Sequence, residues 1–279
     1  AGGEDEVVIS ECTCRSGERF GGGIDANDLF AEKIDRSKAF AQGGSRVIAS
    51  SNDGPGLAKV ADSCSGMKGS VTTVTFDLSE TAGIDELVAS VVKREGRVDM
   101  LLNIGGKSQR ALIKETPLWL DRKIMEINYF GTIALTKAVL PHMIAGGGGH
   151  IAATSSISGR FGFPLRSAYS ASKQALHGFF ETLLLEHGKD NIRVSVLIPG
   201  RVKTMISLHA LTATGVEHGK MDGGQAGGVT PAKAAEQIIR GLRRNRREIL
   251  VGSSELLMLK IRKYMPALFF RIAGKIEPM

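Results

Sequence analysis

Residues 154–179 read TSSISGRFGFPLRSAYSASKQALHGF, and this stretch decides both the expected fold and the expected chemistry. Tyr169 and Lys173 lie four residues apart, so on a helix they share one face. Ser156 precedes the tyrosine by thirteen residues. For the Tyr–Lys pair alone, a surface pair on an amphipathic helix is the simpler interpretation. Together with the serine, the pair predicts proton transfer to a carbonyl or alcohol oxygen, with the ammonium lowering a phenol pKa that is otherwise about 10.

Strand-like and helix-like segments alternate on both sides of this stretch. The alternation predicts parallel strands joined by helical crossovers, which is a doubly wound, Rossmann-like α/β sheet of about seven strands. No repeat or interdomain linker interrupts the pattern, so residues 1–279 are predicted to form one domain. The expected strands are 7–9, 46–50, 71–78, 98–103, 150–156, 192–198 and 247–252, and the expected helices are 84–92, 119–144 and 167–186.

Several polar residues fall where these strands end. Ligands of such sheets bind at the carboxyl ends of the strands, and Asp77, Asn103, Ser156 and Pro199 all occupy those ends. Asn128 lies inside the long helix, where asparagine is mildly unfavourable, and it is predicted to distort the backbone there. A buried polar residue at a local distortion is the alternative interpretation of Asn128.

This constellation, with the segments SQRALIKETP, EINYFGT, PGRVKT and GLRRNRREILVG, resembles the short-chain dehydrogenase/reductase family over about residues 45–279. The resemblance is strongest to its dehydrogenase/reductase member 7 and 7B group. It implies hydride transfer between a nicotinamide cofactor and a carbonyl or alcohol group. It further implies that Tyr169 exchanges the proton, that Ser156 orients the carbonyl, and that Asn128 holds a water for a proton relay. Lys173 would lower the tyrosine pKa and hold the nicotinamide ribose.

The same resemblance assigns a set of cofactor contacts. Asp77 would accept from the adenine amine, although it is also suited to cap the helix that follows. The end of the second strand, through Ser51, offers neither an acid for ribose hydroxyls nor an arginine for a 2′-phosphate, which slightly favours NADP over NAD. The full expected set is Asp77, Asn103, Tyr169, Lys173, Pro199, Gly200, Val202 and Thr204, with Ser10, Gly17 and Ser51 as weaker candidates.

Residues 10–39 depart from the family pattern. The family places T-G-x-x-x-G-x-G after the first strand, so that glycine backbone approaches the pyrophosphate. Here Ser10 would stand for the threonine and Gly17 for the last glycine, but Glu11 replaces the first glycine and would repel phosphate. Either this stretch is a corrupted or wrongly spliced reading, or the protein has lost tight dinucleotide binding. The second alternative predicts a pseudoenzyme or binding protein of the same fold.

Composition excludes some other classes. The chain has 279 residues, of which 42% are apolar and 23% charged, as expected of a soluble globular protein. Three cysteines cannot form a disulfide framework, so a reducing compartment is expected, and Cys12 and Cys14 lack partners for a zinc site. No metal site is predicted. The net charge of +7 is the one argument for nucleic-acid binding, and the basic run at 240–247 is interpreted as a solvated helix end.

The ends of the chain and the loop at 205–228 bear on partners. The acidic start AGGEDEVVIS predicts neither a signal peptide nor a membrane span. Residues 253–279 mix apolar and basic side chains, which predicts either a last core helix broken at Pro266 or a segment lying on a membrane surface. A cytoplasmic protein is expected, or one peripheral on the endoplasmic reticulum or another intracellular membrane.

The expected substrate is hydrophobic, such as a lipid, steroid or retinoid-like carbonyl, and residues 205–228 are expected to form a lid over it. Within that loop, His209 and His218 are interpreted as solvated. Family resemblance implies a homodimer or homotetramer.

Overall fold

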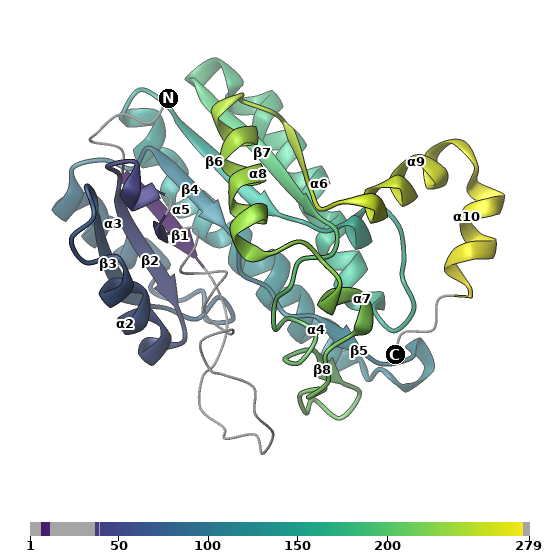
Figure 1. The fold of residues 1–279 in the computed structure, drawn as a ribbon. Coiled ribbons are helices and arrows are strands. Elements are labelled where there is room, and N and C mark those ends of the chain that lie inside the picture. The colour runs from purple at the N-terminus through teal and green to yellow at the C-terminus, as the bar shows by residue number, and fades with distance from the viewer. Residues whose placement is uncertain (1–6, 12–36, 39, 276–279) are drawn as a thin grey trace.

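The computed structural model describes residues 7–11, 37–38 and 40–275, and a seven-stranded parallel sheet forms its centre (Figure 1). The strand order is β3-β2-β1-β4-β6-β7-β9, and each neighbouring pair is parallel. The strands are β1 Val7–Glu11, β2 Arg46–Ser51, β3 Ser70–Thr75, β4 Met100–Asn103, β6 Gly149–Thr154, β7 Ile192–Pro199 and β9 Glu248–Val251. The predicted doubly wound sheet of seven strands is therefore confirmed.

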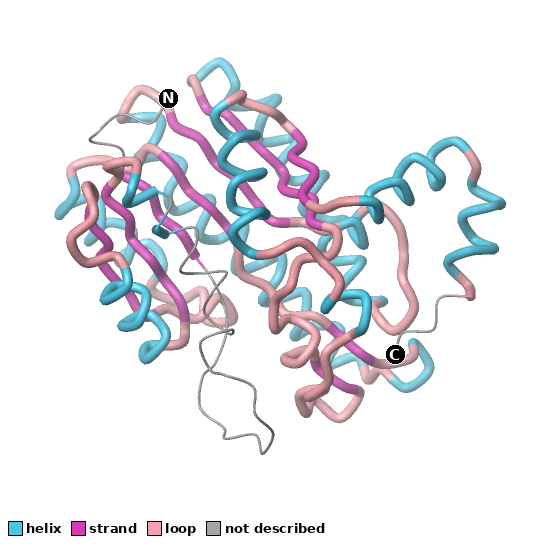
Figure 2. Tube along the Cα trace, viewed as in Figure 1, coloured by secondary structure: helices cyan, strands magenta, loops and turns pink. Residues whose placement is uncertain are grey.

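The direction of strand progression reverses between β1 and β4, which is the topological switch point where such sheets bind ligands. Two strand ends differ from the prediction. β3 ends at Thr75, so Asp77 lies in the following loop, and β6 ends at Thr154, so Ser156 lies two residues beyond its strand. Figure 2 shows the loops that follow β4 and β7 at this carboxyl-end edge of the sheet.

Helices cover both faces of the sheet. The central strands β4 and β6 are buried along almost their whole length, and their successive residues point to opposite faces of the sheet. Leu101 and Ile151 pack toward α3 (Ile84–Glu95), α5 (Gly131–Ala145) and α6 (Ser167–His187). Leu102 and Ala152 pack toward α8 (Pro231–Arg243) on the other face, where α2 (Gly54–Ser63) lies against β2 and β3 (Figure 1).

The helix predicted at 119–144 is divided in the structure. α4 (Leu118–Met125) continues into a π-helical turn at Glu126–Phe130 and then into α5. The N–H of Gly131 donates to the carbonyl of Glu126 and closes the wide turn. The predicted distortion at Asn128 is therefore present. π-helical turns inside α-helices occur frequently at functional sites.

Several short elements escaped the sequence-based prediction. β5 (Gln109–Arg110) and β8 (Leu211–Thr212) pair in parallel as a separate two-stranded sheet, and α7 (Gly223–Ala226) lies in the loop after β7. Short 3₁₀ turns occupy Ile113–Glu115, Ile157–Gly159, Gly188–Asp190 and Ser254–Leu256. The basic residues at 240–247 lie exposed at the end of α8, as expected.

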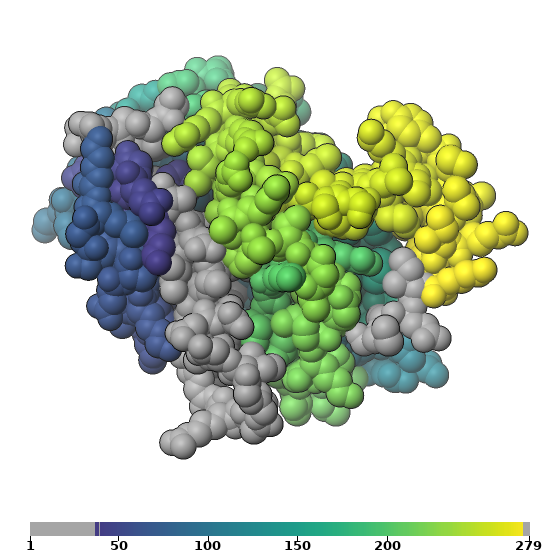
Figure 3. Space-filling model, viewed as in Figure 1, coloured from purple at the N-terminus to yellow at the C-terminus, as the bar shows by residue number. Residues whose placement is uncertain are grey.

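The tail forms two helices, α9 (Leu257–Tyr264) and α10 (Pro266–Ala273), with the break at the predicted proline. Phe269 is buried against Phe161, at 4.7 Å between ring centroids, which attaches α10 to the body. α9 has no buried residue. Figure 3 shows the pair standing out from the rest of the molecule. None of the described helices combines the length and apolar character that a membrane crossing requires.

Candidate functional site

The phenol of Tyr169 and the hydroxyl of Ser156 meet beyond the carboxyl end of β6. Tyr169 lies in the first turn of α6, its side chain is buried, and it forms a side-chain hydrogen bond with Ser156. The Ser156 Oγ also accepts from the N–H of Ser158 at 3.1 Å and so caps the 3₁₀ turn that follows β6. These contacts fix the serine hydroxyl beside the tyrosine, as the sequence predicts.

The acidity of Tyr169 differs from the prediction. Burial raises the pKa of the phenol, because the phenolate would lose its hydration. The hydrogen bond with Ser156 and the positive charges of Arg166 and Arg110 oppose this increase without cancelling it. The expected lowering of the pKa is therefore wrong for the protein without ligands, and the charges that stabilise the phenolate include two arginines that the sequence did not indicate.

These two arginines share one carboxylate, and we call Arg110, Arg166 and Asp222 the arginine–aspartate cluster. The Asp222 Oδ2 lies 2.5 Å from the Arg110 Nη2 and 2.7 Å from the Arg166 Nη2. The side chain of Arg110 is only 3% exposed. The three residues come from β5, from the segment before α6 and from the loop after β7. The cluster therefore attaches the expected lid loop beside Tyr169 and leaves one net positive charge there.

Lys173 is buried one turn after Tyr169 on α6. Its Nζ donates to the carbonyl of Thr154 at 2.7 Å and lies 3.5 Å from the carbonyl of Gly105. The ammonium is thus held between the ends of β6 and β4, on the nucleotide side of the site expected from the fold.

Asn128 is fully buried and contacts the loop after β4. Its Oδ1 accepts from the Lys107 N–H at 2.7 Å, and its Nδ2 donates to the Lys107 carbonyl at 3.0 Å and to the Ser172 Oγ at 2.9 Å. A Cβ at Gly106 would come within 3.0 Å of both the Asn128 Oδ1 and the Lys173 Nζ. A larger residue at 106 would therefore displace these two side-chain ends, and the structure brings Asn128 and Lys173 to the same stretch of backbone.

The residues expected to bind the adenosine half lie at the ends of β2, β3 and β4. Asn103 is buried, and its Nδ2 donates to the Thr136 Oγ1 at 3.2 Å. Asp77 accepts from the Asn52 Nδ2 at 2.9 Å and from the Ser79 N–H at 2.9 Å. The alternative role of Asp77 as a helix cap is wrong, because α3 begins only at Ile84 with Gly83 as its N-cap.

The segment expected to meet the nicotinamide follows β7. The Gly200 N–H donates to the Val251 carbonyl at 2.7 Å, and Val202 is buried beside Val229. Thr204 accepts from the Gln225 Nε2 at 3.2 Å, so α7 supports this segment. Pro199 is the last residue of β7.

At the first strand, Ser10 pairs in register with Ala49 and Leu102, and Glu11 pairs with Ser50 and Asn103. Gly17 and most of the atypical stretch at 10–39 lie outside the described residues. A family model described as short chain dehydrogenase matches residues 35–213.

The chain belongs to the short-chain dehydrogenase family.

Named relatives agree with this assignment. Dehydrogenase/reductase SDR family member 7B from Xenopus laevis is 38% identical over 243 residues, which cover 85% of this chain and 75% of the relative. The member 7B protein of Danio rerio is 40% identical over 201 residues, 72% of this chain and 65% of that protein. A family protein 7-like of Drosophila melanogaster is 42% identical over 205 residues, 73% and 63% of the two chains. The chain thus spans slightly less than two thirds of the length of the last two relatives.

Solved structures match this fold over nearly the whole chain. A short-chain dehydrogenase from Streptomyces avermitilis superposes with a TM-score of 0.75 at 24% identity, covering 97% of this chain and 96% of its own. A short-chain dehydrogenase/reductase from Burkholderia phymatum, solved in complex with NAD, also gives 0.75, at 19% identity and with 99% and 98% coverage. The predicted fold and family are confirmed.

Buried polar atoms without a hydrogen-bond partner indicate whether this member of the family could hold a dinucleotide. The Asn52 Oδ1, Asn103 Oδ1 and Thr154 Oγ1 are buried and find no hydrogen-bond partner in the part of the chain that the structure describes. They lie at or just beyond the carboxyl ends of β2, β4 and β6. Buried polar atoms are almost always paired, so three orphans along this edge fit a polar ligand.

Two acids escaped the sequence-based prediction of the short-chain dehydrogenase site. Asp53 follows β2 and caps α2, where its Oδ1 accepts from the Gly56 N–H at 3.1 Å, while its own N–H donates to the Ser51 Oγ at 3.2 Å. An aspartate directly before Gly54-Pro55 is a helix-start signal that was available in the sequence. Glu255 accepts from the Arg201 N–H at 2.9 Å, and a Cβ at Gly200 would lie 2.3 Å from its Oε1. No local pattern indicates that contact.

His209 was also misread as solvated. It is 9% exposed, and its Nδ1 lies 2.8 Å from the Glu217 Oε2, while the Lys107 Nζ lies 2.8 Å from the Glu217 Oε1. Glu217 therefore joins the loop after β7 to the loop after β4. Together with the arginine–aspartate cluster, this gives the loop at 205–228 two ionic attachments to the site.

Proposed function

We propose that the protein is a nicotinamide-dependent oxidoreductase that acts on a hydrophobic carbonyl or alcohol. The observation that carries this proposal is the buried Tyr169–Ser156 pair at the carboxyl end of β6, with Lys173 on the next turn of the same helix. A bound nicotinamide dinucleotide supplies or accepts the hydride at the substrate carbon.

In the direction of reduction, Tyr169 donates its phenolic proton to the substrate oxygen. The Ser156 hydroxyl donates a hydrogen bond to the same oxygen and stabilises the negative charge that builds there. Arg110 and Arg166 stabilise the phenolate that remains. In the direction of oxidation, Tyr169 reacts as the phenolate and accepts the proton of the substrate alcohol.

Lys173 and Asn128 have supporting roles in this proposal. The Lys173 ammonium lies between two carbonyls at the strand ends, where a ribose hydroxyl would be its next acceptor. Asn128 holds both polar groups of the Lys107 backbone, and its Oδ1 and the Lys173 Nζ both lie close to Gly106. Reprotonation of Tyr169 along Lys173 and Asn128 is the proposed relay.

For the cofactor we propose NADP, with NAD as the competing form. The support lies at the end of β2, where the carboxylate of Asp53 is turned toward the N-terminus of α2. In that position it caps the helix, whereas a carboxylate selective for NAD faces the ribose hydroxyls. A comparison of the two dissociation constants tests the preference.

The hydrophobic substrate is supported by apolar side chains next to the lid loop. Val216 and Met221 lie exposed in that loop, and Trp119 packs close to Gly215 while remaining half exposed. Leu112 and Ile113, which follow β5, add to the exposed apolar surface. Exposed apolar patches of this kind mark binding sites more often than chance.

A second candidate function is a binding protein of the same fold with an impaired dinucleotide site. Glu11 is the last residue of β1 and stands in the sequence where the family motif has its first glycine, and a carboxylate at that position of the motif would repel a pyrophosphate. The Glu255 carboxylate accepts a hydrogen bond from the Arg201 N–H and lies against Gly200. The nicotinamide end of the cofactor is expected at this segment. These two acids are the observations that favour this alternative.

A fluorescence titration with NADPH separates the two functions. Micromolar binding by wild type, retained in Tyr169→Phe, with carbonyl reduction lost by at least a thousandfold in that variant, is the result expected of the enzyme. Absence of binding at millimolar NADPH would establish the binding protein instead. Restoration of T-G-x-x-x-G-x-G after Ile9 would then rescue binding only if the atypical stretch is the cause.

We also propose a homodimer or homotetramer. Phe130, at the π-helical turn, and Leu185, on α6, expose 45% and 84% of their side chains, and both belong to the long helices expected at the interface. Light scattering after size-exclusion chromatography would give twice or four times the chain mass, and a monomer at micromolar concentration would reject the proposal.

A further inference from the structure

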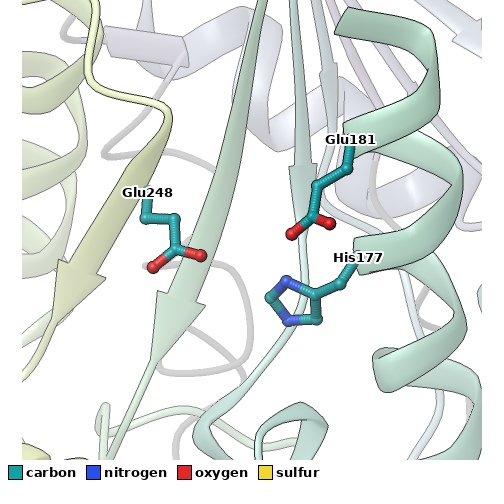
Figure 4. A group of neighbouring side chains, drawn as sticks. All are labelled: His177, Glu181 and Glu248. Carbon is teal, nitrogen blue, oxygen red and sulfur yellow. The ribbon is translucent and has the colours of Figure 1, made fainter. Parts of the chain in front are cut away.

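Three candidate metal ligands meet on the face of the sheet that α6 covers, away from the lid loop. His177 and Glu181 lie four residues apart on α6, and Glu248 is the first residue of β9. One ligand atom from each residue lies within 4.8 Å of the others. Figure 4 shows a ring nitrogen of His177 facing the Glu181 carboxylate, with Glu248 across the gap. Exposed acids alone would not indicate a metal site, so the inference depends on the hydrogen bonds of the buried His177 ring.

The hydrogen bonds of His177 define its tautomer. The Ser155 Oγ donates its one proton to the carbonyl of Lys173 at 2.8 Å. The same oxygen lies 2.8 Å from the His177 Nε2, so Nε2 must carry the proton and donate to the serine. The Nδ1 of the neutral ring is therefore a bare lone pair.

This lone pair is buried and directed at the two carboxylates. His177 is 6% exposed, and its Nδ1 has no hydrogen-bond partner among the residues that the structure describes. The His177 Nδ1 and one carboxylate oxygen from each acid are therefore three electron-pair donors that converge on one point.

Arg160 is the positive group that already stands near. Its Nη2 contacts the Glu248 Oε1, and the charge of Glu181 raises the pKa of Arg160 against the larger effect of burial. One guanidinium against two carboxylates leaves a net charge of −1. The Arg160 side chain is 31% exposed, and metal binding would require it to turn outward as Glu248 turns toward the metal.

We propose that His177, Glu181 and Glu248 bind a divalent transition-metal ion, with Zn²⁺ as the best-fitting probe. One imidazole nitrogen and two carboxylate oxygens suit Zn²⁺ better than Mg²⁺ or Ca²⁺, which prefer oxygen alone. The bond from the His177 Nε2 to Ser155 is the outer contact that metal-bound histidines ordinarily make. Bound metal would join α6, the helix of Tyr169 and Lys173, to the edge strand β9. The site is therefore structural and distinct from the proposed oxidoreductase chemistry.

Calorimetric titration of the chelator-treated full chain with ZnCl₂ tests this site. Wild type should bind one Zn²⁺ at these ligands with a micromolar dissociation constant. Glu181→Gln removes an exposed ligand without disturbing the core, and it should weaken binding at least tenfold. Glu186→Gln is the matched control, because it makes the same change at an exposed position on the same helix, and it should bind as wild type does.

A second measurement identifies the imidazole ligand. His177→Gln keeps a donor for Ser155 but removes the lone pair, so it should also weaken Zn²⁺ binding at least tenfold while retaining the wild-type circular dichroism spectrum. The reference protein and every variant should carry serine in place of Cys12 and Cys14, so that the thiol pair cannot bind the ion in any of them. Equal affinity in wild type, Glu181→Gln and His177→Gln would overturn the proposal, as would the absence of binding to wild type below 1 mM (about 4 kcal/mol).

Discussion

At the scale of single residues, burial lowers the pKa of two histidines, His150 and His177, and a serine partner sets the tautomer of each ring. The Ser195 Oγ donates to the carbonyl of Arg246 at 2.7 Å and lies 2.8 Å from the His150 Nε2, which must therefore donate to it. This is the same arrangement as His177, Ser155 and the Lys173 carbonyl. One such hydrogen-bonded pair joins β6 to β7, and the other joins α6 to the segment after β6. Protonation of either histidine by acid should destabilise the interior.

Acid should destabilise the fold through His150. Burial, followed by the positive charge of Arg193, lowers the pKa of His150 from 6.5 to about 4. A histidine with a lowered folded-state pKa contributes stability that is full above pH 6.5 and is lost as the pH falls toward 4. Between pH 7 and pH 5 this one residue should account for about 2 kcal/mol of the free energy of unfolding.

Urea unfolding of wild type and His150→Gln at the two pH values measures this contribution. The variant keeps a neutral donor for Ser195, so its free energy of unfolding should fall about 2 kcal/mol less than that of wild type. Identical losses in the two proteins would show that His150 is not a source of acid sensitivity.

The sequence predicts the identity of the central side chains but not their electrostatics. Tyr169, Ser156, Lys173 and Asn128 could be selected from spacing and family resemblance, and the structure brings them together. The direction of the Tyr169 pKa shift could not be predicted, because it depends on burial and on Arg110, whose chain position is 59 residues away. Desolvation is a property of the folded neighbourhood and leaves no trace in local sequence.

At the scale of elements, the junction of the π-helical turn with α5 leaves no space for a side chain. A Cβ at Gly131 would lie 2.2 Å from the carbonyl oxygen of Leu78, which is backbone and cannot rotate away. Gly131→Ala should therefore lower the free energy of unfolding by about 1–3 kcal/mol, although alanine is the better helix former. Thermal unfolding is the measurement, and Gly178→Ala on α6, where nothing lies within 4 Å, is the control.

The loop after β7 should loosen when Asp222 loses its charge. Asp222→Asn leaves two guanidiniums near each other without a counter-charge, and breaking one partner of a buried pair costs about 3–5 kcal/mol. Limited proteolysis should cleave the loop at 205–228 faster in this variant. Because the uncompensated arginines favour the phenolate, the pKa of Tyr169 should also fall. Cleavage at the wild-type rate would show that Glu217 alone holds the loop.

Elements differed in how well the sequence predicted them. The strands and α6 were found because apolar runs and the Tyr–Lys spacing are local signals. β5, β8 and α7 were missed because two to four residues carry no periodicity, and their pairing depends on where the loops after β4 and β7 meet. The ion pairs of Glu217 and Asp222, which attach the loop at 205–228, were likewise not predicted, because no local sequence pattern indicates them.

At the scale of the whole molecule, the projecting tail favours the second alternative for residues 253–279, a segment that lies on a membrane surface. Tyr264, Leu268 and Phe270 are exposed on or beside α9 and α10, and Lys263 and Arg271 lie among them. An apolar face with basic residues binds anionic interfaces, with about 1 kcal/mol for each basic residue near the surface. We expect the protein to sediment with phosphatidylserine vesicles.

Matched changes locate this binding. Phe270→Ser with Leu268→Ser should release the protein from the vesicles, whereas Leu250→Ser on β9, which removes a comparably exposed apolar group elsewhere, should not. Phe269 must be left intact, because it anchors α10 to Phe161. Failure of wild type to sediment would reject the membrane-surface alternative for residues 253–279.

The π-helical turn at 126–130 has one further consequence. Its hydrogen bond spans five residues where an ordinary helix spans four, so the turn holds one residue more than a regular helix would. Deletion of a single residue there would let α4 and α5 merge into one uninterrupted cylinder. That shortened protein should melt at a higher temperature yet no longer present the Asn128 amide to Lys107. The extra residue thus lowers the stability of the helix and, in return, orients the Asn128 side chain toward Lys107.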